Sequence, residues 1–460
     1  MTRVAINAWT GREAATGEPV GRTEWALAGT VLPPVGRARP RPKNEWDWCD
    51  PRVGWGLVLP HRPGLTNAQL AVAVDAPTPI QRLVAARSGA KVLRYMPGTT
   101  WGSWTLRDYA TGSQPPIATA PEGTDPGSLP AYLLIYAGPE EIPWEVQYHL
   151  NPVRNVGRLH LTGPALENYV NALLSDWRGS AARYDSPVVW AVDHGGGDIT
   201  TIMRETLAEP LHAAFVADGE MGRATMLEGP AATARGLAAT LDAASPLVVV
   251  TTSHGLTGPL DQPDLMRSTL GALVDAAHEP LDPAGLLSSW EPDGMIWLAQ
   301  ACCSAGAAAP SMYRGLFDPA EPVGEVIEAV AALGPMVAPL PTALLGAPRP
   351  ARAFIGQVEP TFDWTLYFPL TGQWQSGSLR DAVYQNLCRG EPAGYALREV
   401  YQPIGSLLQS HSRSVGRYNG LPPGAASRQA VEVALYNKAT AYDRASTVLL
   451  GDPTVAVPLP

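Results

Sequence analysis

Two short strings of the chain each place a residue with acid–base or nucleophilic chemistry directly after an apolar run. His254 lies in the string TTSHG (251–255) after the run 247–250, and Cys302 and Cys303 lie in QACCS (300–304) after the run 295–299. A free thiol is mostly protonated at neutral pH, so it needs a base to become a good nucleophile. An imidazole can supply that base. The two strings therefore predict a cysteine nucleophile paired with His254.

The same strings resemble the signature of caspase-like cysteine peptidases, in which a Gln-Ala-Cys string follows its histidine by about 50 residues. That match makes Cys302 the nucleophile, and the Ala-Cys-x-Ser string of the CHAT branch points to the same residue. The Cys-x-x-Gly string of separases and metacaspases instead ends at Gly306 and points to Cys303. The resemblance implies a Cys-His dyad without a third catalytic residue, with Cys302 preferred and Cys303 as the alternative.

Further strings are similar to bacterial gingipain-type and CHAT relatives, namely 133–142, 155–159 and 449–453. This resemblance implies a two-part α/β unit with an N-terminal subdomain against a caspase-like domain. We therefore expect residues 1–180 to form the N-terminal region and subdomain, with 1–125 of unknown role, and residues 181–460 to form the catalytic domain.

Attack of a thiolate on a peptide carbonyl creates an oxyanion that backbone N–H groups can stabilise. We expect these groups to belong to Gly255 and to Cys302 itself, each contributing about 3 kcal/mol as in comparable sites. A glycine at position 255 suits this role because it permits close approach of a substrate.

For substrate specificity, the resemblance implies that Gln300, two residues before the nucleophile, lines the pocket for the residue before the scissile bond. Asp193 and Glu359 each follow a predicted strand and are candidate carboxylates for a basic side chain. We therefore expect a peptide or protein substrate, with a slight preference for Arg or Lys before the scissile bond.

A serine esterase is a second reading of the sequence. His194 and the three glycines after it resemble the oxyanion loop of lipases and esterases, and Ser304 has a glycine two residues later. The esterase order of residues would require His411, which lies in a polar stretch expected to be a loop. We therefore expect the glycine run instead to form a tight loop near the substrate groove. A third reading is a caspase-like scaffold without activity.

No metal or cofactor is expected from the sequence. The chain contains no Cys-x-x-Cys pair and no His-Glu-x-x-His string, which are the common zinc-binding patterns.

The elements around these strings alternate between continuous apolar strands and helices. Strands are expected at 132–136, 188–192, 247–251, 296–301 and 352–356, with helices between them. Such alternation predicts a mainly parallel sheet with helices on both faces, here a caspase-like three-layer sandwich plus an N-terminal α/β subdomain. The strands that end at Thr251 and Ala301 should be adjacent and parallel, because functional groups gather at the carboxyl ends of such strands.

The first part of the chain is rich in Pro, Gly and Trp. Residues 33–34 and 37–42 are expected to be irregular, and 111–130 reads by composition as a linker.

The net charge and the cysteine content limit which binding partners and which cellular compartment we expect. The net charge of −10 argues against nucleic acid as a partner. No long apolar run predicts a membrane span or an export signal, and four cysteines with two adjacent favour a reducing cytoplasm. An open thiol peptidase would endanger its own cell, so we expect an activating partner or ligand. Candidate mobile segments are 258–263 and 305–311.

Overall fold

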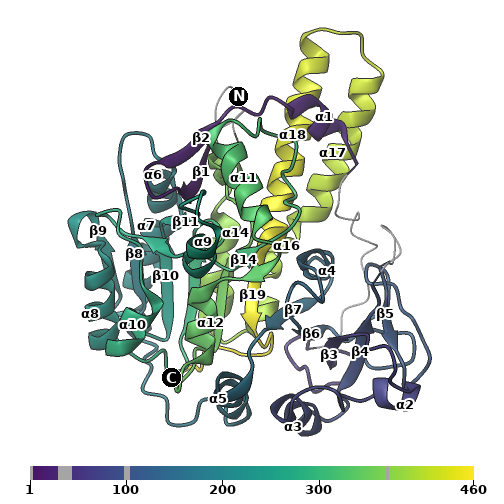
Figure 1. Ribbon diagram of the computed structural model, residues 1–460. Helices are drawn as coiled ribbons and strands as arrows, with labels where there is room; N and C mark the ends of the chain where they lie inside the picture. Colours follow the sequence, from purple (N-terminus) through teal and green to yellow (C-terminus); the bar gives the residue numbers. More distant parts are fainter. Residues whose placement is uncertain (1–3, 30–43, 98–103, 369–371) are drawn as a thin grey trace.

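The computed structural model describes residues 4–29, 44–97, 104–368 and 372–460, so the segments at 33–34 and 37–42 lie outside the described residues. An eleven-stranded sheet runs through the protein (Figure 1). From edge to edge its strands are β5 (Leu106–Asp108), β4 (Lys91–Tyr95), β3 (Trp55–Pro60), β6 (Tyr132–Tyr136), β7 (Asn155–Leu159), β19 (Thr447–Gly451), β16 (Ala353–Gln357), β13 (Ile296–Gln300), β10 (Val248–Thr252), β8 (Val188–Ala191) and β9 (Thr225–Glu228). Antiparallel pairs form between β4 and β5 and between β16 and β19, and the sheet is otherwise mainly parallel.

The two strands that lead to the chemistry-bearing strings are neighbours. β10 and β13 pair in parallel over their whole length, with Val248 opposite Ile296 and Thr252 opposite Gln300. The prediction of adjacent, parallel strands is therefore confirmed. Because the register places Thr252 beside Gln300, His254 and Cys302 both follow their paired position by two residues.

Helices cover both faces of the sheet. One layer contains α3 (Thr78–Ala86), α5 (Gly163–Leu174), α12 (Pro339–Gly346), α10 (Pro283–Ser289) and α8 (Ala234–Ala244). The other contains α6 (Ile199–Met203), the π-helical turn η1 (Arg204–Ala208), α7 (Glu209–Ala217), α14 (Gly377–Asp381), η4 (Ala382–Asn386), η5 (Leu387–Arg389), α15 (Ala393–Ala396) and α16 (Arg398–Tyr401).

Adjacent residues of β13 show that these layers lie on opposite faces. Trp297 packs against Trp290 after α10, with ring centroids 6.3 Å apart, whereas Leu298 lines a small cavity with Leu379 of α14. Successive side chains of a strand point to opposite faces. The predicted three-layer α/β sandwich with a mainly parallel sheet is thus confirmed.

A second, four-stranded sheet brings the start of the chain to the carboxyl ends of β10 and β13. Its order is β12 (Leu273–Val274), β11 (His254–Leu256), β1 (Val4–Trp9) and β2 (Ala14–Gly17). In this sheet β1 runs parallel to β11, with Ala8 opposite Gly255. Elsewhere along its length β1 bridges Phe362 through Ile6. Strand β1 therefore contacts both the string that carries His254 and the segment after β16.

Two long helices form a hairpin that projects from the body of the protein, α17 (Pro403–Asn419) and α18 (Ala425–Ser446) (Figure 1). The expected loop around His411 is therefore wrong, because His411 is a buried residue of α17. Its Nε2 lies within hydrogen-bond distance of the Ala26 carbonyl in α1 (Arg22–Leu27). The serines beside His411 are polar but compatible with a helix surface, which explains the error.

The segment 111–130 also differs from its reading as a linker. Ile117, Ala120 and Leu129 are buried and pack with Leu93 and Leu133 of the sheet. Its abundant Pro, Gly and Ser residues set turns, while its few apolar side chains anchor it.

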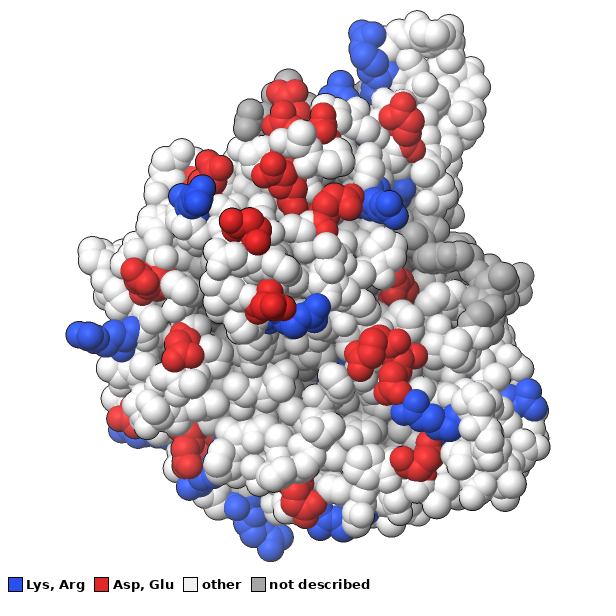
Figure 2. Space-filling view, viewed as in Figure 1, with Lys and Arg blue, Asp and Glu red and all other residues white. Residues whose placement is uncertain are grey.

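The remaining short elements are α2 (Asn67–Leu70), α4 (Trp144–Leu150), α9 (Pro263–Thr269), α11 (Pro322–Ala332), α13 (Asp363–Leu366), η2 (Gly219–Met221), η3 (Gly229–Ala231), β14 (Gly306–Ala307), β15 (Met336–Val337), β17 (Tyr367–Phe368) and β18 (Gln373–Trp374). Across the described residues, every helix is too short or too polar to cross a membrane. On the face shown in Figure 2, Lys and Arg side chains are dispersed among acidic ones.

Arg158 of β7 provides a test of the packing beneath α4. Its guanidinium is fully buried, lies 4.5 Å from the Trp144 ring and donates to the carbonyls of Ala137, Ile142 and Pro143. Arg158→Met should lower the free energy of unfolding by about 3 kcal/mol or more, because several buried carbonyls lose their donors. Denaturant unfolding measures this change.

The matched control is Arg178→Met, since Arg178 is exposed. Its expected effect is within about 0.5 kcal/mol. Equal effects of the two substitutions would contradict a structural role for the Arg158 contacts.

Candidate active site

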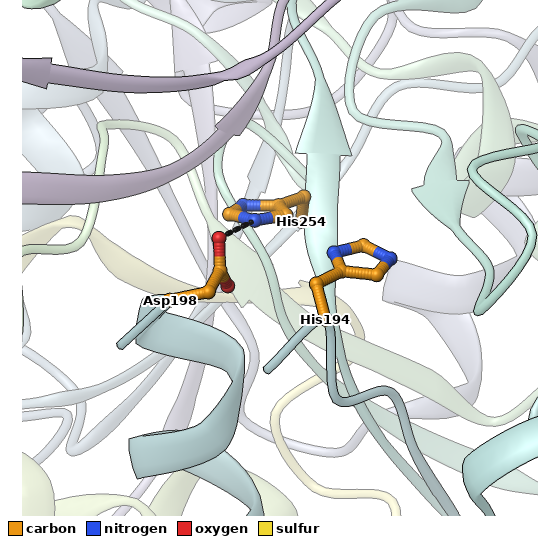
Figure 3. A group of neighbouring side chains, drawn as sticks. All are labelled: His194, Asp198 and His254. Atoms are coloured by element: carbon orange, nitrogen blue, oxygen red, sulfur yellow. Dashed lines mark hydrogen bonds and ion pairs between the residues drawn. The ribbon is translucent and has the colours of Figure 1, made fainter. Parts of the chain in front are cut away.

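His254 is held from one side by Asp198. His254 is fully buried, and its Nε2 lies 3.0 Å from Oδ2 of Asp198 (Figure 3). The other oxygen of Asp198 caps α6, accepting hydrogen bonds from the Thr200 backbone N–H at 2.8 Å and the Thr200 hydroxyl at 2.6 Å. An aspartate is a favoured residue at this position of a helix. The helix cap thus fixes the carboxylate that orients the imidazole.

This pairing also sets the charge of the carboxylate and the tautomer that the neutral imidazole adopts. Burial would raise the pKa of Asp198, but its hydrogen bonds with His254 and Thr200 outweigh burial and lower its pKa to about 2. Asp198 is therefore ionised at neutral pH and accepts a hydrogen bond from Nε2–H of His254. The neutral ring then carries its lone pair on Nδ1, which is buried and has no hydrogen-bond partner. Nδ1 is the ring nitrogen available as a base.

His194 lies beside His254 at the start of a glycine-rich loop. Its ring stacks on His254 with centroids 5.3 Å apart and on His278 at 4.1 Å, and its Nε2 lies 3.0 Å from the Asp275 carbonyl. Burial and the two neighbouring imidazoles lower the pKa of His194, although the Asp275 carbonyl opposes the shift. The glycines at 195, 196 and 197 all have φ between 62° and 85°, a region that favours glycine. The predicted tight loop is confirmed.

Both cysteines lie in the protein interior. Cys302 is fully buried, and its thiol donates a hydrogen bond to the side-chain carbonyl of Asn7 in β1. The same Asn7 oxygen accepts the backbone N–H of Thr361 at 3.2 Å. Burial, followed by the neighbouring thiol of Cys303, raises the pKa of Cys302 well above its ordinary value. The Cys302 thiol is therefore protonated at neutral pH in this conformation.

Cys303 lies at a sharp turn of the chain. It is also fully buried, and its φ of 54° places it in the left-handed region. A non-glycine residue there costs about 1–2 kcal/mol. Burial and the nearby carboxyl of Glu359 raise its pKa. The chain thus turns sharply directly after Cys302.

The backbones of the two strings are in direct contact. A Cβ atom added at Gly255 would lie 1.9 Å from the carbonyl oxygen of Cys302. Position 255 therefore excludes any side chain in this conformation. The expected oxyanion donors, the N–H groups of Gly255 and Cys302, lie in these adjoining segments, and their role stays a prediction.

The three residues predicted to bind the substrate each have partners inside the protein. Gln300 is buried, with its Nε2 3.4 Å from the Thr361 hydroxyl. Asp193 forms an ion pair with Arg204 at 3.0 Å; burial would raise its pKa, but this pair and hydrogen bonds from Thr201 and Gly195 keep that pKa below its ordinary value.

Glu359 accepts hydrogen bonds from the Ser311 hydroxyl at 2.7 Å and the Met312 N–H at 3.0 Å. Burial raises its pKa to about 8 against the effect of these bonds. For each of the three residues, an internal contact would have to be exchanged for one with substrate. Their part in specificity stays a prediction.

The residues of the esterase reading have separate partners. The Ser304 hydroxyl is fully buried, donates to the Ala299 carbonyl at 3.2 Å and accepts the Gln357 N–H at 3.0 Å. His411 contacts Ala26 in α1 instead. The hydrogen bonds of Ser304 therefore serve the turn after β13.

Sequence reasoning missed His194, Asp198 and Asn7 as neighbours of the predicted pair. Asp198 carries the signal of a helix start, with a threonine two residues later, but that signal does not reveal a histidine from another strand.

The expectation of no metal ligands did not anticipate one group of neighbouring side chains. One ligand atom from each of His194, Asp198 and His254 lies within 4.8 Å of the others, so these side chains form a potential metal-binding group.

Comparisons with known proteins give distant structural similarity. No protein-family model and no curated protein matches the sequence. Among solved structures, the chain is similar to the Arg-specific cysteine proteinase gingipain R, with a TM-score of 0.37 and 13% identity over 71% of this chain and 64% of that chain. It is also similar to a complex of the RgpB pro- and mature domains from Porphyromonas gingivalis, with a TM-score of 0.36 and 12% identity over 71% and 65% of the two chains. The chain thus spans less than two thirds of either structure.

The Asp198–His254 contact predicts a pH-dependent contribution to stability. Because the folded-state pKa of Asp198 lies near 2, below its ordinary value of 3.8, the ionised carboxylate stabilises the fold above that ordinary pKa. Asp198→Asn should cost about 2 kcal/mol at pH 7, and the difference from wild type should shrink as the pH falls from 5 towards 2. Denaturant unfolding across this pH range measures it.

Asp242→Asn is the control, because Asp242 is exposed on α8. A deficit of Asp198→Asn that stays constant as the pH falls would mean that the ionised carboxylate is not its source.

Proposed function

We propose that this protein is a cysteine endopeptidase in which Cys302 attacks the substrate carbonyl and His254 acts as the base. The observation that carries the proposal is the parallel pairing of β10 and β13, with Thr252 opposite Gln300. It delivers a histidine and a cysteine to the same edge of the sheet at equivalent positions. The backbone contact between Gly255 and Cys302 supports the same arrangement.

In the proposed reaction, Nδ1 of His254 takes the thiol proton as Cys302 Sγ bonds to the substrate carbonyl carbon. The N–H groups of Gly255 and Cys302 would stabilise the negative oxygen. The protonated imidazole then gives its proton to the leaving amine, and water hydrolyses the resulting thioester. Asp198 would keep the proton of the neutral ring on Nε2 and stabilise the imidazolium.

The resting protein is, on this proposal, a latent form. The Cys302 thiol is enclosed by β1 and by the segment around Thr361, and its hydrogen bond goes to Asn7. Cleavage therefore requires β1 or this segment to move, so that Nδ1 reaches Sγ and a peptide reaches both. An activating partner or ligand would drive this movement, and the segments 258–263 and 305–311 beside the site would accommodate it.

The proposed substrate is a peptide with Arg or Lys before the scissile bond. Asp193 is ionised and partly exposed, so it is the best placed of the proposed carboxylates to meet a basic side chain. Gln300 would line the same pocket, and Glu359 would contribute only after release from Ser311.

The full burial of both thiols also favours a second candidate, a scaffold that retains the fold without activity. A buried cysteine in apolar surroundings is usually inert. Activity assays on variants separate the two candidates.

The substitutions have distinct expected effects on cleavage of Arg- and Lys-containing peptides by the activated chain. Cys302→Ala should abolish cleavage, and His254→Ala should slow it by several orders of magnitude, because the thiol loses its proton acceptor. Cys303→Ala should remain active. Steady-state hydrolysis measures all three variants.

Opposite results for the two cysteines would make Cys303 the nucleophile. Equal rates in wild type and in Cys302→Ala would favour the scaffold. Labelling of Ser304 by a fluorophosphonate would instead revive the esterase reading.

The latent form makes a separate prediction for alkylation by iodoacetamide. In the resting chain the exposed Cys49 should react quickly, whereas Cys302 should react slowly because it is enclosed and protonated. Asn7→Ala should accelerate the reaction at Cys302, because the thiol loses its hydrogen-bond acceptor and its cover. Mass-spectrometric peptide mapping over time measures each site.

The control for this experiment is Asn67→Ala, which removes an exposed asparagine in α2. It should leave the reactivity of Cys302 unchanged. Labelling of Cys302 as fast as that of Cys49 in the resting wild type would show that no cover protects the thiol.

A further inference from the structure

Three side chains beside the predicted thiol site bring possible metal-ligating atoms close together. One ligand atom from each of His194, Asp198 and His254 lies within 4.8 Å of the others, and the three residues come from the loop after β8, the start of α6 and the start of β11 (Figure 3). We propose that His194, Asp198 and His254 bind a divalent transition-metal ion of the zinc class, and that the bound ion blocks His254 as a base.

The orientation of His194 supports a ligand role. Its Nε2 is close to the Asp275 carbonyl at 3.0 Å, so Nε2 carries the ring proton. Nδ1 then carries the lone pair, and it is buried without a hydrogen-bond partner. Histidines that bind metals almost always donate their other N–H in this way to a carbonyl or carboxylate. The backbone of Asp275 therefore prepares His194 to bind through Nδ1.

Asp198 is prepared in a similar manner. Its Oδ1 is occupied by the backbone N–H and hydroxyl of Thr200, whereas Oδ2 faces Nε2 of His254 at 3.0 Å. Tetrahedral zinc with ligand distances near 2.1 Å separates its ligand atoms by about 3.4 Å. The 3.0 Å between Asp198 Oδ2 and His254 Nε2 is close to this value, whereas the His194 ligand atom lies within 4.8 Å of the other two. Rotation of His194 and Asp198, both only partly buried, would bring the three atoms to the ion.

The donor atoms select the class of ion. Two imidazoles and one carboxylate are a common set for catalytic or inhibitory zinc, with a fourth position left for solvent. Magnesium and calcium prefer sites made of oxygen atoms. We therefore expect zinc to bind at this group and magnesium not to compete.

Binding would change the proton on His254 without releasing it. In the free protein Nε2–H donates to Asp198 and Nδ1 holds the lone pair. An ion on Nε2 needs the lone pair there, so the single proton moves to Nδ1, which becomes a donor. The ring can then no longer accept the thiol proton. This inhibitory consequence rests on the proposed peptidase function, whereas the binding itself does not.

The test measures zinc binding to the chelator-treated full chain by competition with a chromophoric chelator. Wild type should bind one zinc ion, and a hundredfold excess of magnesium should leave the affinity unchanged. His194→Ala and Asp198→Asn should each weaken binding by tenfold or more. His160→Ala is the matched control, because His160 is a partly exposed histidine near Glu140 and should bind as wild type does.

Cys302→Ala separates binding from activity and from thiol ligation. It should retain zinc affinity, since no thiol belongs to the proposed ligands. Loss of binding in Cys302→Ala with retention in His194→Ala would overturn the proposal, as would equal affinity in all histidine variants. Zinc should also raise the melting temperature of wild type but not of His194→Ala, which detects a variant that is merely misfolded.

In the activated chain, zinc should inhibit cleavage and a chelator should restore it, and the ratio of rates with and without zinc should approach one in His194→Ala. Zinc binding without peptide cleavage by any form would defeat the proposed function alone. Cleavage with no zinc affinity would defeat this inference alone.

Discussion

The hydrogen bonds of the Asn7 side-chain carbonyl determine the state of the whole site. That oxygen accepts the Cys302 thiol and the Thr361 N–H, so it joins the first strand, the turn after β13 and the segment after β16. Because β1 also pairs with β11 through Ala8 and Gly255, the start of the chain is built into the site. Strand β1 thus helps to enclose the Cys302 thiol, and burial is the largest cause of the raised pKa of that thiol.

Asp198 uses its two carboxylate oxygens for two different contacts. One oxygen caps the N-terminus of α6, and the other accepts a hydrogen bond from the His254 imidazole and so orients it. A rotation of the carboxylate would disturb both the helix cap and the histidine, so each contact reinforces the other. The same coupling brings His194 near, because the glycine loop that turns after β8 ends at this cap.

Much of the sheet could be predicted from local sequence. Continuous apolar runs placed β6, β8, β10, β13 and β16 within a residue or two, since buried parallel strands require such runs. The pairing of β10 with β13 followed from their shared chemistry. The long helix around His411 was missed because its exposed face is rich in serine. The burial of Ile117 and Leu129 was missed because two or three apolar side chains are too few to show the periodicity of a helix or a strand.

The contacts of His254 and Cys302 could not be predicted for a different reason. Asn7 and Asp198 lie far from them in sequence, and each has an ordinary local role, in a strand and at a helix start. Only the three-dimensional fold brings Asn7 to the Cys302 thiol and Asp198 to the His254 imidazole. Sequence reasoning therefore predicted two residues that the sheet carries to one edge, but not the contacts that each of them makes.

The contact between Gly255 and the Cys302 carbonyl has a consequence for how such chains diverge. The absence of a side chain at 255 is required by the backbone alone, whatever residue occupies position 302. A related chain without the thiol would still need this glycine, because any larger residue would clash with the backbone after β13. The glycine is thus a marker of common architecture, whereas the histidine and the cysteine are the positions that bear on chemistry.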